Sequence, residues 1–200
     1  PTSTYPFFML LLNHLTNDRI DENNTIEIFE IIESFLVRRA VCGHEPTGLH
    51  AVFKRLWKDC NNNPTAELVT STIKKHVTVA WPSDSDFSSA IKERVLDKAQ
   101  ITKYLLYSFN KSLGGDKPLD DPWIEHILPE NPDESWQEFF PDKSQQLFLK
   151  GLLANLIHLS EPMNRKVSNK SYKIKRETYL DHSNYKAARD LAEKYNEWTP

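Results

Sequence analysis

Four polar residues in the carboxyl-terminal part of the chain have types and an order suited to the hydrolysis of phosphodiesters. Glu125 and His126 stand side by side in the apolar segment 124–129, and Asn155 and Asn164 follow them. An imidazole titrates near neutral pH, so His126 can take a proton from an attacking water. Carboxylate and amide oxygens suit Mg²⁺ or Mn²⁺, which Glu125 and Asn164 could bind. Asn155 carries donors and an acceptor that can hold the loop of His126 against a second strand.

This order of residues predicts the active site of a metal-dependent nuclease of the ββα-metal, or HNH-like, type. His126 and Asn155 are the predicted catalytic residues, and Glu125 and Asn164 are the predicted metal ligands. Adjacent residues of an ideal strand point to opposite faces, so Glu125 and His126 can share a site only where the strand ends or bulges. Pro129 favours an end in this region. The predicted metal site therefore depends on a break in the strand.

A basic block follows these residues and predicts contact with nucleic acid. Residues 165–189 carry a net charge of +6, whereas the whole chain carries -3. A local positive face on an otherwise acidic protein can bind the phosphates of DNA. The alternative is a solvated helix surface, which is the commoner use of such a charge run. The candidate DNA contacts are Arg165, Lys166, Lys170, Lys173, Lys175 and Arg176.

The elements that must position these residues are predominantly helical. Apolar residues recur at three- and four-residue steps along the amino-terminal part, which predicts helices. Asn24 is a candidate cap for a helix over 24–42. A helix over 100–113 is expected to end at Gly114 and Gly115.

Two short apolar segments, 123–128 and 155–160, predict strands that flank a short helix over 143–150. The basic block and the segment 183–195 predict further helices. The expected fold is mainly α, with a helical subdomain over 1–115. A carboxyl-terminal ββα-metal unit with a short two-stranded hairpin is expected over 116–200.

The same residues resemble the C-terminal nuclease domain of GmrSD-type, modification-dependent bacterial restriction endonucleases. That family shows an acid-His-Ile/Val-x-Pro motif, a Gly-Asn-Leu-x-x-Leu segment and an Asn-rich run that leads into a basic helix. The corresponding segments are 125–129, 154–159 and 164–176. The resemblance extends upstream in pattern through 33–43 and 81–87. The sequence departs from the family at Ala154, where glycine is usual, and at Glu125, where many relatives in the broader nuclease class have aspartate.

The resemblance implies a metal-dependent DNA endonuclease or nickase that serves bacterial anti-phage restriction. It implies His126 as the general base, and Glu125 and Asn164 at a bound Mg²⁺ or Mn²⁺. It also implies an N-terminal nucleotide-hydrolysing sensor domain in the same longer chain. A single site of this kind nicks one strand, so pairing into a homo-oligomer would be needed for double-strand breaks. The alternative is a catalytically inactive DNA-binding or regulatory module on the same scaffold.

Other features of the sequence exclude several classes of protein. The longest apolar run, 7–12, is far shorter than the roughly 20 residues that span a bilayer. The two cysteines, Cys42 and Cys60, cannot form a disulfide framework, which fits a reducing cytoplasm. No Gly-rich phosphate loop is visible, so no nucleotide hydrolysis is expected within these residues. His158, beside Asn155, is expected to be a structural histidine.

Overall fold

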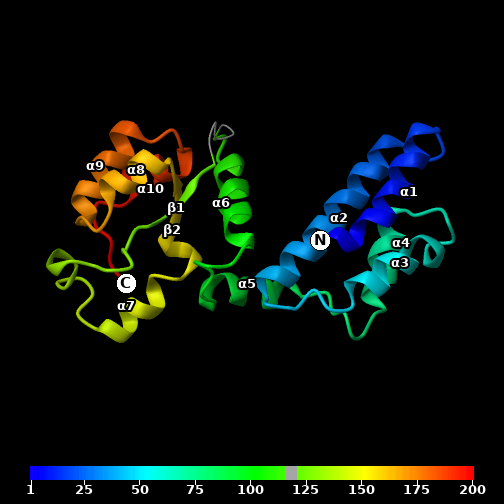
Figure 1. Ribbon diagram of the computed structural model, residues 1–200, viewed down its shortest axis with the longest axis horizontal. Helices are drawn as coiled ribbons and strands as arrows, with labels where there is room; N and C mark the ends of the chain where they lie inside the picture. Colours follow the sequence, from blue (N-terminus) through cyan, green and yellow to red (C-terminus); the bar gives the residue numbers. More distant parts are fainter. Residues whose placement is uncertain (116–120) are drawn as a thin grey trace. The chain divides into compact units, whose positions relative to one another are not determined.

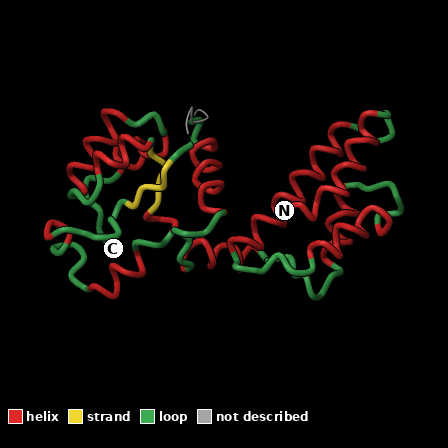
Figure 2. The backbone as a smooth tube through the Cα atoms, in the orientation of Figure 1, coloured by secondary structure: helices red, strands yellow, loops and turns green. Residues whose placement is uncertain are grey.

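The computed structural model describes residues 1–115 and 121–200, which form a mainly helical protein with one two-stranded antiparallel sheet (Figure 2). The chain folds into two compact units, Pro1–Ser88 and Ser89–Pro200. The predicted mainly α class with a single short hairpin is confirmed. Within the described residues, no helix is both long and apolar enough to cross a membrane.

The first unit is built from helices that bury one apolar face each. Its elements are η1 (Thr2–Thr4), α1 (Tyr5–Thr16), α2 (Glu22–Val41), α3 (Leu49–Asp59) and α4 (Ala66–Lys74). Ile28, Ile32 and Phe35 recur at helical spacing on α2 and are fully buried in the core of this unit. The cap of α2 is Asp21, which accepts a hydrogen bond from the backbone of Asn24, so the cap predicted at Asn24 is wrong.

The second unit contains the hairpin and the helices around it. Helix α5 (Asp84–Glu93) includes the boundary between the units. The remaining elements are α6 (Ile101–Ser112), β1 (Trp123–His126), η2 (Glu134–Trp136), α7 (Lys143–Leu149), η3 (Leu153–Asn155), β2 (Leu156–Leu159), α8 (Glu161–Val167), α9 (Tyr172–His182) and α10 (Lys186–Lys194). The two strands and the helices α6, α7 and α10 lie close to the ranges that the sequence predicts.

The boundary between the units lies upstream of the division expected at residue 115. Helix α6 belongs to the second unit because it packs against β2 and α10. One link is a hydrogen bond of 3.0 Å from the backbone nitrogen of Ala187 to Oδ1 of Asn110. The expected start of the nuclease unit, at residue 116, lies outside the described residues. The assignment of a separate function to residues 1–115 and 116–200 stays a prediction.

The hairpin has a continuous antiparallel register, from Trp123 opposite Leu159 to His126 opposite Leu156. Helix α6 lies on one side of the hairpin, and α8 and α9 lie on the other (Figure 1). Because helices cover both sides of the hairpin, every residue of β2 is buried. The strands therefore form the centre of the second unit and fix the position of the residues at their ends.

Candidate active site

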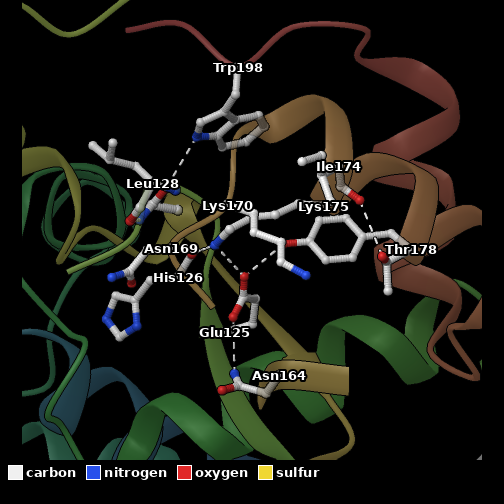
Figure 3. A network of polar contacts seen from close by, with 12 residues as sticks. Glu125, His126, Leu128, Asn164, Asn169, Lys170, Ile174, Lys175, Thr178 and Trp198 are labelled. Carbon is white, nitrogen blue, oxygen red and sulfur yellow. Dashed lines mark hydrogen bonds and ion pairs between the residues drawn. The ribbon is translucent and has the colours of Figure 1, made fainter. Parts of the chain in front are cut away.

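Glu125 and His126 lie on opposite faces of β1. The register runs through both residues without interruption, so the strand alternates normally there. Glu125 is buried, with 4% of its surface exposed, whereas the His126 ring points away from that carboxylate (Figure 3). β1 ends at His126, as the prediction allows, but its pairing continues through that residue and the end does not turn the two side chains to one face. The two side chains therefore face different surroundings.

The carboxylate of Glu125 is held by donors from two helices behind the strand. Oε1 accepts hydrogen bonds from Lys175 Nζ at 2.6 Å and from Tyr179 Oη at 2.9 Å. Oε2 accepts from Asn164 Nδ2 at 3.0 Å. Burial raises the pKa of Glu125, and the charge and hydrogen bond of Lys175, with the Tyr179 bond, oppose that rise.

These contacts differ from the arrangement expected of the predicted metal ligands, which stay a prediction. Glu125 and Asn164 are brought together, but Asn164 donates to Glu125 instead of pointing an oxygen at a shared cation. Asn164 contacts the Glu125 carboxylate, and the His126 ring lies apart from both side chains (Figure 3). The side chains of Glu125 and Asn164 therefore do not surround a common cation position with the His126 ring.

Lys175 is fully buried, which corrects its predicted contact with DNA. Its ammonium donates to Glu125 and, at 2.7 Å, to the backbone carbonyl of His126. It also lies 6.0 Å from the ring centre of Trp136. Burial lowers the pKa of Lys175, and the Glu125 carboxylate opposes that change. With its donors turned inward, this side chain does not reach a phosphate at the surface.

Asn155 makes the tie that the sequence predicts between the second strand and the segment after His126. Its side chain accepts from the backbone nitrogen of Leu128 at 2.7 Å and donates to the carbonyl of Leu128 at 2.9 Å. Its backbone carbonyl accepts from the nitrogen of Ile127 at 2.9 Å. It also donates to the carbonyl of Lys150 and accepts from Trp198 Nε1 at 3.1 Å. The backbone of Ile127 and Leu128 is thus held by both the main chain and the side chain of Asn155.

The imidazole of His126 faces two carboxylates, Asp97 and Glu130. One ligand atom from each of the three residues lies within 4.8 Å of the others. Nε2 of His126 lies 3.9 Å from Oδ2 of Asp97 and is buried without a hydrogen-bond partner among the described residues. Burial lowers the pKa of His126, and the nearby carboxylates of Glu130 and Asp97 oppose that change.

These three residues fit a divalent cation. Carboxylate oxygens bind Mg²⁺ and Mn²⁺, so Asp97 and Glu130 could hold the ion with the neutral imidazole beside it. An unpartnered buried nitrogen between two acids also needs a counterpart, because an unsatisfied buried polar atom is costly. Glu130 directly follows the 125–129 motif, so its place in the sequence was a usable signal. Nothing in the sequence singled out Asp97.

The predicted DNA contacts divide according to their partners. Lys166, Lys170 and Lys173 are exposed and available to a phosphate. Arg165 pairs with Glu161 in the next turn of α8. Its guanidinium also lies 5.5 Å from the ring centre of Trp123.

Arg176 is the remaining predicted contact, and it is partly buried. Its Nε donates to the carbonyls of Ala192 at 2.8 Å and Tyr195 at 3.1 Å, which links α9 to the end of α10. This bond gives Arg176 a role within the fold that the basic pattern did not reveal. The exposed part of the predicted set therefore centres on the three lysines.

His158 is a buried residue of β2 and has no hydrogen-bond partner for either ring nitrogen among the described residues. Its ring centre lies 6.0 Å from that of Tyr185, edge to face. Burial, with the nearby Lys103 ammonium, lowers the pKa of His158 to about 4, and Asp121 opposes the change. This environment favours the structural reading of His158.

Comparison with known proteins links this geometry to a family. Residues 81–200 match the family model described as the C-terminal domain of GmrSD restriction endonucleases. The matched range covers more than half of the chain and includes the whole cluster of Asp97, His126 and Glu130. No curated protein and no solved structure matches the chain.

Proposed function

This chain belongs to the GmrSD restriction endonucleases through its residues 81–200, and from that premise we propose that it hydrolyses DNA phosphodiesters with a bound divalent cation. The observation that carries the proposal is the cluster of Asp97, His126 and Glu130 inside the matched domain. The domain suggests the nuclease effector of a restriction system. The cleavage chemistry and its residues are our assignment.

The carboxylates of Asp97 and Glu130 would hold the cation, with His126 beside them as the general base. When bound, a divalent cation stabilises the negative charge that develops on the phosphate oxygens. The lowered pKa of His126 keeps the imidazole neutral near pH 7, so its unpartnered Nε2 can accept a proton from the attacking water. Asn155 and the hairpin hold the backbone of His126 in place while this proton moves.

The strand order supports an HNH-like reading of this unit. Two antiparallel strands are followed directly by α8, which packs against β1, and His126 ends the first strand. We therefore assign residues 116–200 as a ββα-metal unit, completed by Asp97 from the segment before α6. The helical first unit, Pro1–Ser88, would be a separate subdomain.

DNA would lie across the exposed lysines of α8, α9 and the turn between them. Lys166, Lys170 and Lys173 are the contacts that this proposal retains. We extend the proposal to a cytoplasmic role in anti-phage restriction, which the match to the restriction endonuclease family supports. It would involve an N-terminal nucleotide-hydrolysing sensor domain in a longer chain and pairing of chains for double-strand cleavage.

Plasmid nicking tests the proposal. We expect the protein to convert supercoiled plasmid to open circle with Mg²⁺ or Mn²⁺, and we expect EDTA to abolish the conversion. His126→Ala should lose cleavage and retain DNA binding in a gel shift. Cleavage that survives His126→Ala would refute the assignment of the base.

The second candidate is an inactive DNA-binding module. The observation that favours it is the engagement of both Glu125 oxygens and of Asn164 by the protein itself. An inactive module binds DNA equally well with and without EDTA and nicks no plasmid under either condition. The same experiment therefore separates the two functions.

A further inference from the structure

Lys175 and Glu125 form a buried ion pair directly behind the residue proposed as the general base. Lys175 Nζ lies 2.6 Å from Glu125 Oε1 and 2.7 Å from the carbonyl oxygen of His126 (Figure 3). One ammonium therefore joins a carboxylate of β1 to the backbone of the next residue along the strand. Of the Lys175 side chain, 0% is exposed.

The pair is hydrogen-bonded by groups from three elements. Tyr179 of α9 donates to the same Glu125 oxygen, and Asn164 of α8 donates to the other. A buried ion pair adds little to stability against a well-packed apolar pair, and its best-attested use is to fix one arrangement of the chain. Here the arrangement that it fixes is the position of α8 and α9 against the end of β1.

The ammonium also completes the restraint of the chain around His126. Beyond His126, Asn155 bonds the backbone nitrogens of Ile127 and Leu128 and the carbonyl of Leu128. Lys175 bonds the carbonyl of His126 itself. The backbone carbonyl of His126 and the two residues that follow are thereby held from two directions, by Asn155 of η3 and by Lys175 of α9.

We propose that Lys175 and Glu125 act as a positioning pair for His126, holding its imidazole against Asp97 and Glu130, and touch neither DNA nor the cation. This inference rests on the proposed function, and it assigns roles that differ from those expected for both residues. Removal of a group that orients a metal-site residue typically lowers metal affinity or activity by about 10–100-fold. A positioning role for His126 predicts losses in that range without a change in DNA binding.

The variants must remove the pair without leaving a buried charge. Lys175→Met alone leaves the Glu125 carboxylate buried without its positive partner, which can unfold the unit. The double variant Glu125→Gln/Lys175→Met removes both charges, keeps an amide that Tyr179 and Asn164 can contact, and deprives the His126 carbonyl of its donor. Lys173→Met is the matched control, because Lys173 lies on the same helix with its side chain exposed.

Two readouts separate the pair from a DNA contact. In the double variant we expect kcat for plasmid nicking and the affinity for Mn²⁺ alone, titrated by electron paramagnetic resonance, each to fall by about 10–100-fold. We expect the slope of log binding constant against log salt to stay at the wild-type value. In Lys173→Met the salt slope should become shallower by about 0.9, with the Mn²⁺ affinity unchanged.

The outcomes also distinguish this inference from the proposed function. A double variant that matches the wild type in kcat and in Mn²⁺ affinity overturns the positioning pair and leaves the nuclease assignment standing. A shallower salt slope in the double variant, with normal Mn²⁺ affinity, overturns it in favour of a DNA contact. A wild-type protein that neither binds Mn²⁺ nor nicks plasmid overturns the proposed function and the role of the pair together.

Discussion

Asp97 and His126 meet at the end of the hairpin, with Oδ2 of Asp97 3.9 Å from Nε2 of His126. The segment before α6 is held there by Gly151, whose carbonyl accepts from the backbone nitrogen of Leu96 at 2.7 Å and from that of Asp97 at 3.2 Å. A Cβ on Gly151 would lie 2.6 Å from Cγ1 of Val95, so a larger residue there would require the Val95 side chain to move. The position of Asp97 thus depends on a backbone contact.

Replacing Asp97 with asparagine should weaken metal binding more than it weakens the fold. The amide keeps the shape of the side chain and removes the charge that would hold the cation, while the backbone bonds to Gly151 remain. We expect the affinity for Mn²⁺ to fall by at least about tenfold. Even residues that contact only the ligands of a metal, and not the metal itself, usually cause losses of this size when they are replaced. Nicking should fall in parallel, which plasmid assays over a Mn²⁺ titration would measure.

The control for this substitution is Glu177→Gln, which removes one exposed carboxylate from α9. It changes the net charge of the chain by the same amount and should leave both Mn²⁺ affinity and nicking unchanged. Equal losses in the two variants would assign the effect of Asp97→Asn to overall charge instead of to a cation at this place.

The exposed lysines should contribute to DNA affinity through charge alone. We expect Lys166→Met and Lys170→Met each to weaken binding on any DNA sequence and to make the salt slope shallower by about 0.9. Arg165 is already paired with Glu161, so Arg165→Met should have a smaller effect. Fluorescence anisotropy at several salt concentrations measures these slopes. If the salt slope is unchanged in all three variants, DNA does not contact α8 or the turn after it.

Much of the fold could be predicted because its signals are local. Helical spacing of apolar residues locates α6, and short apolar segments locate the two strands. The tie between Asn155 and the chain after His126 was also predictable, because an asparagine at the start of a strand offers both donors and acceptors. The helices and strands depend on residues that are near neighbours in the chain, whereas the tie follows from the donors and acceptors of the Asn155 side chain.

The candidate site was less predictable because it depends on contacts between distant segments. Strand alternation turns Glu125 inward and His126 outward, and the sequence does not show which helices supply partners to each face. Asp97 is placed by backbone hydrogen bonds to Gly151, which is distant from it in the sequence. Lys175 appears in the sequence as one more charge of a basic run, although its ammonium is buried against Glu125.

Asn155→Asp should destabilise the hairpin by leaving backbone acceptors unpaired. The carboxylate keeps the acceptor for the nitrogen of Leu128 and for Trp198, but it loses both donors, to the carbonyls of Leu128 and Lys150. An unsatisfied buried polar group costs about 1–3 kcal/mol. Trp198→Phe removes one hydrogen bond and should cost about 1 kcal/mol.

Hydrogen exchange at the amides of β2 would measure both losses within the second unit. We expect protection of the β2 amides to be highest in the wild type, lower in Trp198→Phe and lowest in Asn155→Asp. Equal protection in all three proteins would mean that the side chain of Asn155 contributes nothing to the stability of the hairpin. Protection in the first unit, at the amides of α2, is the internal control.

His158 should make the second unit sensitive to acid. In the unfolded chain the pKa of an imidazole is about 6.5. In the fold, burial and the Lys103 ammonium lower the pKa of His158 to about 4, and Asp121 opposes that change. The ring of Tyr185 packs against the His158 ring. Between these values the unfolded state binds more protons, so stability is fully present above pH 6.5 and is lost as the pH falls toward 4. The loss from this residue is about 3 kcal/mol at most.

His158→Phe keeps a ring against Tyr185 and removes the titration, so the unfolding free energy of this variant should depend less on pH over this range. Urea unfolding followed at the β2 amides at pH 7.5 and pH 4.5 measures the difference, with the exposed His50→Gln as control. A pH dependence that His158→Phe leaves intact would assign the acid sensitivity to other groups.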